Sequence, residues 1–146
     1  MRTTRKLGSP LGDHHADMKN RVQLSTRIMN SFEKIWPSKK LKEKKRLKSY
    51  KSIVKSVLTH NMETLGLTKS QEEELDRAHR KQLRRVVRDH NIKNKALYKH
   101  CKEQKLSIEL KKRRWRAFGH MLLLEEQTLC QKAMHYSLVV EESPYL

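Results

Sequence analysis

The sequence has few of the residues that form the turns and strand cores of β-sheet folds. Its 146 residues include four glycines, three prolines and two phenylalanines, and aromatic residues make up 5% of the chain. β-Sandwiches and barrels need many turn residues between strands rich in aromatic side chains, so this composition argues against both. The sequence therefore predicts an all-α fold, a compact bundle of five or six amphipathic helices with basic outer faces.

Cysteine and long apolar runs are also scarce. Cys101 and Cys130 stand far apart without a Cys-x-x-Cys spacing, so no disulfide framework and no cysteine-based zinc site is indicated. No histidine shares a helical face with a useful second ligand, and we expect neither a metal nor a cofactor. The chain has no run of 18 apolar residues and no signal-peptide core near Met1, so we expect an intracellular protein, in the nucleus or cytoplasm.

Acidic residues are few relative to basic ones. The chain has 34 Lys and Arg against 16 Asp and Glu, which leaves a formal charge of +18. A compact chain with so one-sided a charge gains from an anionic partner. Nucleic acid is the first candidate, an anionic membrane surface the second and an acidic protein the third. The membrane is disfavoured because the apolar faces lack a bulky aromatic edge at the basic boundary.

The most regular helical pattern lies in residues 70–88, SQEEELDRAHRKQLRRVVR. Winding at 100° per residue places its apolar side chains on one face and its arginines on the opposite face. Ser70 and Glu73 predict a capping box at the start. His79 lies on the apolar face and is predicted to be a core histidine. One side of this helix therefore predicts a core contact, and the other a contact with anions.

Two helices are predicted before this one. The first begins at Asp13, as its cap, and continues until Pro37 ends it. The second begins at Ser38 and ends between His60 and Gly66, with Gly66 as its C-terminal cap.

Further helices are predicted after it, over 96–104, from Ser107 as a cap, and over 129–138. Trp115 lies on the apolar stripe of the helix that follows Ser107, so core packing is its predicted role. Stacking on a base beside the neighbouring arginines is the alternative. Trp36 is also predicted to lie in the core.

Three basic segments form the predicted nucleic-acid-binding site. Residues 39–55 contain nine basic residues and one Glu. A merely solvated face is the competing interpretation, but few acids at i+4 balance the excess. Such guanidinium and ammonium groups neutralise phosphates without reading bases. The predicted binding residues are Lys44, Lys45, Lys48, Lys51, Lys55, Arg77, Arg80, Lys81, Arg84, Arg85, Arg88, Lys112, Arg113, Arg114 and Arg116.

Several sequence blocks, taken in order, resemble the C-terminal part of reverse transcriptases from non-LTR (LINE-like) retrotransposons. The blocks are LGS at 7–9, NSFEKIW at 30–36, LKSYKSIVKSVLTHNMETLGLT at 47–68, LDRAHRKQLRRVV at 75–87 and LSIELKKRRWRAFGHML at 106–122. The chain departs from the family at His60 and Asn61, where the family has an aromatic residue and often Gly. It also departs at Leu65, where the family has Trp, and at Leu123, where Arg is common.

The resemblance implies a division of the chain. Residues 1–12 would be an extended basic lead at the end of a palm-like segment, and 13–66 the thumb-like helices. Residues 67–124 would be the post-thumb helical region, and 125–146 an acidic tail. In this family of RNA-directed DNA polymerases, a thumb packs beside the template–primer duplex and holds its backbone.

Catalysis is not expected of this chain. The family's polymerase reaction uses two metal ions held by palm aspartates, including an adjacent pair. The four aspartates here, Asp13, Asp17, Asp76 and Asp89, are never adjacent. The sequence therefore predicts no catalytic residue, no metal site and no small-molecule substrate.

Two hypotheses follow. The first is a non-catalytic thumb and post-thumb fragment of a transposable element that binds a duplex or RNA/DNA hybrid backbone without sequence specificity. The alternative is a relic or protein-interaction fragment with no independent activity, whose basic faces matter only when it is docked on a palm domain.

Overall fold

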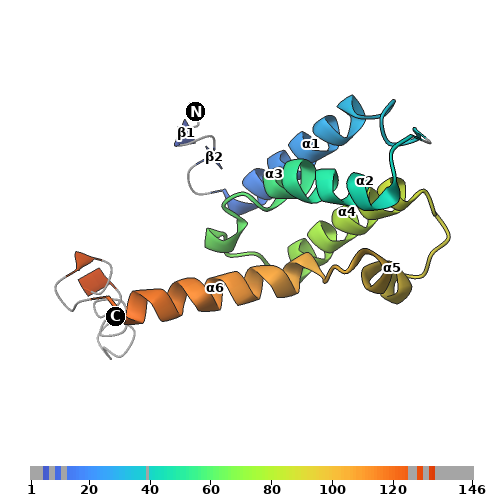
Figure 1. Cartoon of the computed structure of the whole chain (residues 1–146). Coiled ribbons are helices and arrows are strands. Elements are labelled where there is room, and N and C mark those ends of the chain that lie inside the picture. The colour runs from blue at the N-terminus through green and yellow to red at the C-terminus, as the bar shows by residue number, and fades with distance from the viewer. Residues whose placement is uncertain are drawn as a thin grey trace. The chain divides into compact units, whose positions relative to one another are not determined.

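The computed structural model describes residues 5–6, 9–10, 13–38, 40–124, 128–129 and 132–133 (Figure 1). Apart from two paired dipeptides, the regular structure in these ranges is helical, which confirms the predicted all-α class. The elements are β1 (Arg5–Lys6), β2 (Ser9–Pro10), α1 (His14–Ser31), α2 (Glu43–Ser49), the π-helix η1 (Tyr50–Lys55), α3 (Ser56–Thr59), the 3₁₀-helix η2 (Met62–Thr64), α4 (Lys69–Val87), α5 (Asn94–Cys101) and α6 (Leu106–Leu122). β1 and β2 pair antiparallel.

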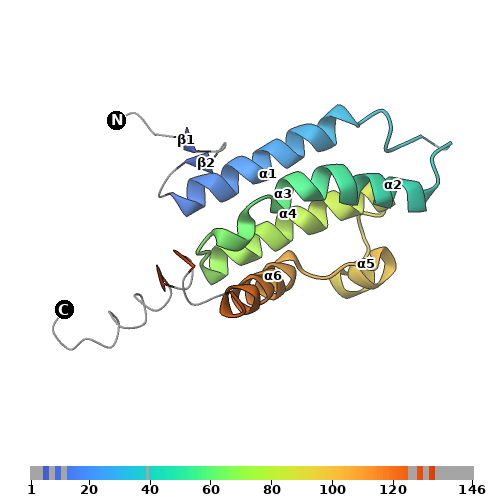
Figure 2. The ribbon, with the colours of Figure 1, turned by 60° about the vertical axis from the view of Figure 1, so that its left-hand side comes forward.

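The chain divides into two units, Met1–Leu110 and Lys111–Leu146, which are described separately. In the first unit α2, η1 and α3 form one continuous helical run. This run packs beside α1 and α4, and α5 packs against α4 (Figures 1 and 2). The predicted thumb-like helices and the start of the predicted post-thumb region therefore share one unit.

The first helix begins as predicted and ends early. The Asp13 carboxylate accepts a hydrogen bond from the Ala16 amide at 2.9 Å, which confirms it as the cap. The prediction that the helix continues to Pro37 is wrong, because α1 ends at Ser31 and turns follow. These turns bring the Trp36 indole N–H to the Met29 carbonyl at 2.9 Å. Trp36 is thereby buried, as predicted.

The second helix does not begin at Ser38, because α2 begins at Glu43. Arg46 donates hydrogen bonds to the Leu41 carbonyl at 2.7 Å and to the Val86 carbonyl at 3.0 Å. These contacts hold the preceding residues in a turn against the end of α4.

That helical run ends one residue before the predicted interval, and Gly66 does not cap it. α3 ends at Thr59, and Asn61 then adopts the left-handed conformation with φ of 58°. The Gly66 amide instead donates to His14 Nδ1 at 3.1 Å. Gly66 therefore helps to join this loop to the start of α1.

The start of α4 is a capping box two residues before the predicted one. Thr68 and Gln71 exchange hydrogen bonds at 3.3 and 2.9 Å, and Ser70 lies inside the helix. Both pairs have the spacing of a capping box, and the earlier pair forms it. Arg88 ends the helix in the left-handed conformation with φ of 69°.

The predicted cap of the next long helix is also wrong. Ser107 lies in the first turn of α6, and its amide and hydroxyl donate to Asp76 at 3.1 and 2.8 Å. The Asp76 carboxylate, from α4, therefore accepts a hydrogen bond from one of the free amides in the first turn of α6. α5 begins at Asn94, earlier than predicted, and ends at Cys101. The helix predicted over 129–138 falls mostly outside the described residues.

The first unit contains two clusters of buried side chains. One comprises Met29, Trp36, Tyr50, Val54, Leu83, Val86, Leu97 and Cys101. The other comprises Met18, Leu58, Met62, Leu65, Leu75, Leu106 and Leu110. α6 contributes Leu106 and Leu110, which lie on one face because they are four residues apart.

The predicted core position of Trp115 is wrong, since its side chain is 72% exposed. Ile108, on the stripe predicted to face the core, is 44% exposed. At 100° per residue, Ile108 lies about 200° around the helix from Leu106. α6 therefore buries the stripe opposite the predicted one.

Candidate nucleic-acid interface

A chain of buried hydrogen bonds crosses the centre of the first unit. Ser25 donates to the Val22 carbonyl at 2.9 Å and accepts from Gln82 Nε2 at 2.9 Å. This orients the amide so that Gln82 Oε1 accepts the Tyr50 hydroxyl proton at 3.1 Å. That hydroxyl has one proton, so His79 Nδ1, 2.8 Å away, must be the donor to its oxygen.

His79 is fully buried, as predicted for a core histidine. Burial, followed by the nearby charge of Lys55, lowers the pKa of His79 from 6.5 to about 4. The imidazole is therefore neutral at pH 7. Its role is to join α4 to η1 inside the fold.

Two of the predicted phosphate-binding lysines belong to a cluster of ion pairs. Lys51 and Lys55 contact Glu103 at 2.8 and 2.6 Å, and Lys55 also contacts Glu109 at 2.8 Å. Burial raises the pKa of Glu103, but its hydrogen bonds to the two lysines outweigh this and hold the pKa below its usual value. The positive charge of Lys55 is therefore neutralised within the protein.

Three predicted arginines of α4 bind neighbouring parts of the chain. Arg84 donates to Asn94 at 2.6 Å and to the Ile92 carbonyl at 3.3 Å. Arg88 donates to the Trp36 carbonyl at 3.0 Å. Arg85 contacts the Asn30 side chain at 2.6 Å and the Glu33 carboxylate at 3.1 Å. These arginines connect α4 to the segments beside it.

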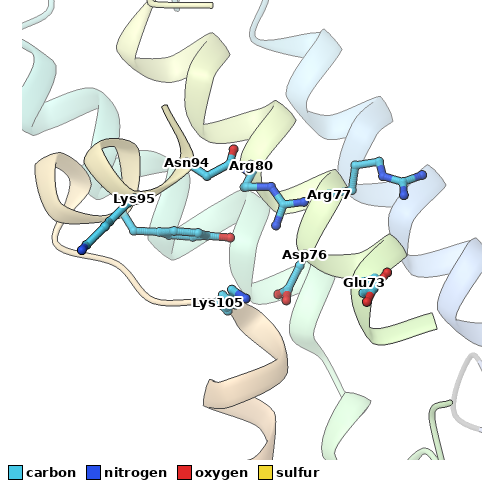
Figure 3. A pocket seen from close by; sticks show the side chains of 8 residues that line it. Glu73, Asp76, Arg77, Arg80, Asn94, Lys95 and Lys105 are labelled. Carbon is cyan, nitrogen blue, oxygen red and sulfur yellow. The ribbon is translucent and has the colours of Figure 1, made fainter. Parts of the chain in front are cut away.

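The other basic residues of α4 are differently placed. Arg77 and Arg80 line a cavity of about 530 Å³ between α4 and α5, here called the α4–α5 pocket (Figure 3). Its lining residues are Glu73, Asp76, Arg77, Arg80, Asn94, Lys95, Tyr98 and Lys105. Figure 3 shows Arg80, Asp76 and Lys105 pointing into the same space, whereas Arg77 and Lys95 extend outward. Lys81 is exposed on the same helix.

Basic residues outnumber acidic ones in the lining of the α4–α5 pocket, with four Lys and Arg against Glu73 and Asp76. The Asp76 carboxylate accepts two hydrogen bonds from Ser107. Tyr98 adds a phenol to the lining. Burial raises the pKa of this phenol above its usual value of 10, and Arg80 beside it offsets only part of that rise. The phenol is therefore protonated at pH 7 and is able to donate a hydrogen bond.

A second cavity, of about 750 Å³, lies between α2 and α5 and is here called the α2–α5 pocket. Its lining residues are Glu43, Lys44, Lys45, Leu47, Lys48, Lys51, His100, Cys101 and Lys102. Glu43, its one acidic lining residue, lies 2.6 Å from His100. Burial raises the pKa of the Cys101 thiol to about 11, so this side chain forms a neutral part of the wall. The pocket combines several ammonium groups with a partly apolar lining.

The predicted binding residues on α6 lie in the second unit. Lys112 and Arg116 are exposed, and Arg113 and Arg114 are partly buried. Arg114 also lines a hollow of about 380 Å³ with Lys111, Trp115 and Phe118. The structure thus groups the predicted basic residues into separate surfaces.

Sequence reasoning missed three lysines that complete the two pockets of the first unit. Lys95 lies in the first turn of α5, Lys102 at its C-cap, and Lys105 just before α6. Residues at helix ends do not contribute to an amphipathic pattern, so periodicity had no signal for them. Their proximity to Arg77 and Arg80 or to the lysines of α2 arises only when α5 folds back.

The described residues contain no group of three or more His, Cys, Asp or Glu that could hold a metal ion. None of the helices formed by them is long and apolar enough to cross a membrane.

A scan against protein-family models and searches of curated proteins and of solved structures give no match to this chain. The resemblance of its sequence blocks to non-LTR reverse transcriptases stays a prediction.

Proposed function

We propose that this chain is a non-catalytic nucleic-acid-binding module that holds the phosphate backbone of a duplex or RNA/DNA hybrid. The resemblance assigns it to the thumb and post-thumb region of a non-LTR retrotransposon reverse transcriptase. The observation that carries the proposal is the pair of cationic pockets in the first unit. Their basic residues are Lys44, Lys45, Lys48, Lys51, Arg77, Arg80, Lys95, Lys102 and Lys105.

These pockets hold fewer acidic than basic residues. Glu43, Glu73 and Asp76 are their acidic lining residues, against nine lysines and arginines. The phosphates of a nucleic-acid backbone supply closely spaced negative charges, so several of these lysines and arginines are able to contact phosphates at once. Lysine and arginine contacts of this kind carry no sequence information, so the proposed binding is not sequence-specific.

The test is the salt dependence of duplex binding. Each phosphate neutralised on duplex DNA contributes about 0.9 to the slope of log affinity against log salt concentration. The double variant Arg77→Gln and Arg80→Gln is expected to reduce the slope by about 2. Fluorescence anisotropy with a labelled hairpin duplex at several salt concentrations measures it.

A charge-matched control is available on α1. Lys19 and Arg27 are exposed and line neither pocket. The variant Lys19→Gln with Arg27→Gln removes the same net charge, and we expect it to leave the slope nearly unchanged. Equal losses in both double variants would mean that binding follows net charge, and the assignment to the α4–α5 pocket would then be wrong.

The second candidate is a protein-interaction fragment that acts only when docked on a palm domain. The exposed leucines at the end of α6 favour it, since Leu122 is 50% and Leu123 87% exposed. This candidate predicts no duplex binding by the isolated chain even at low salt, which the same titration measures.

A further inference from the structure

A buried carboxylate forms part of the wall of the α4–α5 pocket. Asp76 is 5% exposed. Its two oxygens accept hydrogen bonds from the Ser107 amide at 3.1 Å and from the Ser107 hydroxyl at 2.8 Å. A carboxylate has about four acceptor positions, so Asp76 keeps acceptor capacity on both oxygens. Figure 3 shows this side chain pointing into the same space as Arg80 and Lys105, so the pocket combines a hydrogen-bond acceptor with cationic donors.

The acceptor and the donors of this pocket are not paired with one another. Asp76 and Arg80 stand four residues apart on α4, a spacing at which Asp and Arg side chains commonly form ion pairs. Among the described residues, no salt bridge joins Asp76 to Arg80 or to Lys105. A ligand that fits between them therefore needs a negative group for the basic side chains and a hydrogen-bond donor for the carboxylate.

A ribonucleotide within a strand carries both groups. Its phosphate meets the basic side chains, and the 2′-hydroxyl of the adjoining sugar is able to donate to a carboxylate. Side chains at i and i+4 have Cβ atoms about 5 to 6 Å apart, so one nucleotide is large enough to reach both Asp76 and Arg80. A deoxyribonucleotide lacks the hydroxyl. The amino groups of paired bases do not replace it, because they lie in the grooves.

We propose that Asp76 selects RNA by accepting a hydrogen bond from a ribose 2′-hydroxyl whose neighbouring phosphate contacts Arg80 and Lys105. This inference rests on the proposed function and deepens it, because it names the kind of strand that the α4–α5 pocket holds. Asp76 then has two roles, since it also binds Ser107 at the start of α6. A DNA backbone in the same place would bring phosphate oxygens near the carboxylate with no donor between them, which is unfavourable.

The test compares two duplexes that differ only at the 2′ position. An RNA hairpin and the same hairpin made with 2′-fluoro sugars share the A-form shape, but the fluorine does not donate a hydrogen bond. We expect the full chain to bind the RNA hairpin about tenfold more tightly at equal salt concentration, the size expected for one hydrogen bond to a charged group. Fluorescence anisotropy with labelled hairpins measures both affinities. This comparison uses the natural chain and needs no variant.

Asp76→Asn separates recognition of the hydroxyl from the effect of charge. Asparagine has the same shape and keeps an oxygen for the Ser107 amide, but a neutral amide binds a hydroxyl more weakly than a carboxylate does. We expect affinity for the 2′-fluoro hairpin to rise, because a negative charge leaves the pocket, and the preference for RNA to fall below about threefold. If both affinities rose equally and the preference stayed the same, Asp76 would act by charge alone and the inference would be wrong.

Glu73→Gln is the matched control. Glu73 is the other acidic residue of the pocket lining, and its side chain is exposed. The variant removes the same charge, so we expect it to change both affinities alike and to leave the preference for RNA unchanged. Circular dichroism checks that each variant folds.

The outcomes distinguish this inference from the proposed function. Equal binding of the two hairpins with a steep salt dependence would overturn the inference and leave the backbone contact standing. No binding of either hairpin at low salt would overturn both. A free sugar phosphate carries the same two groups, and ribose 5-phosphate is the probe for it. Displacement of the RNA hairpin by millimolar ribose 5-phosphate in the natural chain, and not in Asp76→Asn, would assign the pocket to a free ligand and overturn the assignment to a strand.

Discussion

The interior of the first unit and the surface of its pockets treat positive charge differently. In the interior, Lys55 contacts Glu103, and their side chains are 13% and 6% exposed. At the α4–α5 pocket, Arg77 and Lys95 form no salt bridge with any of the described residues. The charge of Lys55 is therefore balanced within the protein, and the charges of Arg77 and Lys95 are not.

This difference shows that the net charge of +18 has two components. Basic residues paired with acids contribute to folding and have little charge left for a ligand. Basic residues without such partners contribute little to stability and are available to an anion. Substitutions in the interior should change stability, and substitutions in the pockets should change binding.

The largest expected effect is the pH dependence of stability that arises from His79. Its pKa is about 4 in the folded chain, against 6.5 when unfolded, so the unfolded state binds a proton first as the pH falls. The stabilisation is complete above pH 6.5 and is lost towards pH 4. This predicts a loss of about 3 kcal/mol between pH 7 and pH 4. Urea unfolding at a series of pH values measures it.

His79→Gln is the control for this prediction, because glutamine does not titrate. Glu103, Asp76, Glu109 and Lys55 surround His79, and the carboxylates add their own dependence at lower pH. The comparison is therefore made between pH 7 and pH 5. A variant with the same slope as the natural chain in this range would show that another group causes it.

The next effect is expected from the ion pairs. Glu103→Gln removes the carboxylate shared by Lys51 and Lys55, while Glu109 remains 2.8 Å from Lys55. We expect a loss of about 2 kcal/mol at pH 7, less than for a buried charge left with no partner. Because the pKa of Glu103 lies below its usual 4.5, the difference from the natural chain should persist above pH 4.5 and shrink as the pH falls further. Equal stability of the two proteins at pH 7 would contradict this.

A smaller effect is expected at Tyr50. Tyr50→Phe removes the hydroxyl that accepts from His79 and donates to Gln82. The change should cost about 1 to 2 kcal/mol in unfolding free energy, because two buried polar groups lose a partner. Val54→Ala, in the same cluster, shows what loss of packing alone does. A cost under 0.5 kcal/mol for Tyr50→Phe would mean that water replaces the hydroxyl.

The smallest stability effect is expected in the α2–α5 pocket. The triple variant Lys44→Gln, Lys48→Gln and Lys102→Gln should change the unfolding free energy by less than about 0.5 kcal/mol per site. It should lower the salt slope of duplex binding by about 2 to 3. Lys55→Gln should show the opposite pattern, a loss of stability with an unchanged slope. If both variants affected stability alike, the distinction between interior and pocket charges would fail.

Helix positions were largely predictable because hydrophobic periodicity is a local property. The pattern of 70–88 matches α4 within a residue or two, and Asp13 caps α1 as predicted. Helix caps were less predictable. At the start of α4, both Thr68 with Gln71 and Ser70 with Glu73 have the spacing of a capping box, and only the first pair forms one. At α6 the capping carboxylate is Asp76, which is 31 residues away in sequence. Local spacing contains no signal for such a partner.

The burial of Trp115 was wrongly predicted for a related reason. Both the stripe of Ile108 and Trp115 and the stripe of Leu106 and Leu110 contain apolar residues at helical spacing. Periodicity shows that stripes exist and not which of them meets the core. Leu106 and Leu110 are buried in the second cluster, so tertiary packing determines that their stripe faces the core.

The sequence by itself determined the helical class, the approximate helices and the excess of basic residues, because these depend on composition and on neighbours along the chain. Only the tertiary structure decided which basic residues are neutralised. Lys55 and Glu103 are 48 residues apart in sequence and 2.6 Å apart in space. Electrostatic pairing depends on distance in space, and folding alone sets that distance for residues so far apart along the chain.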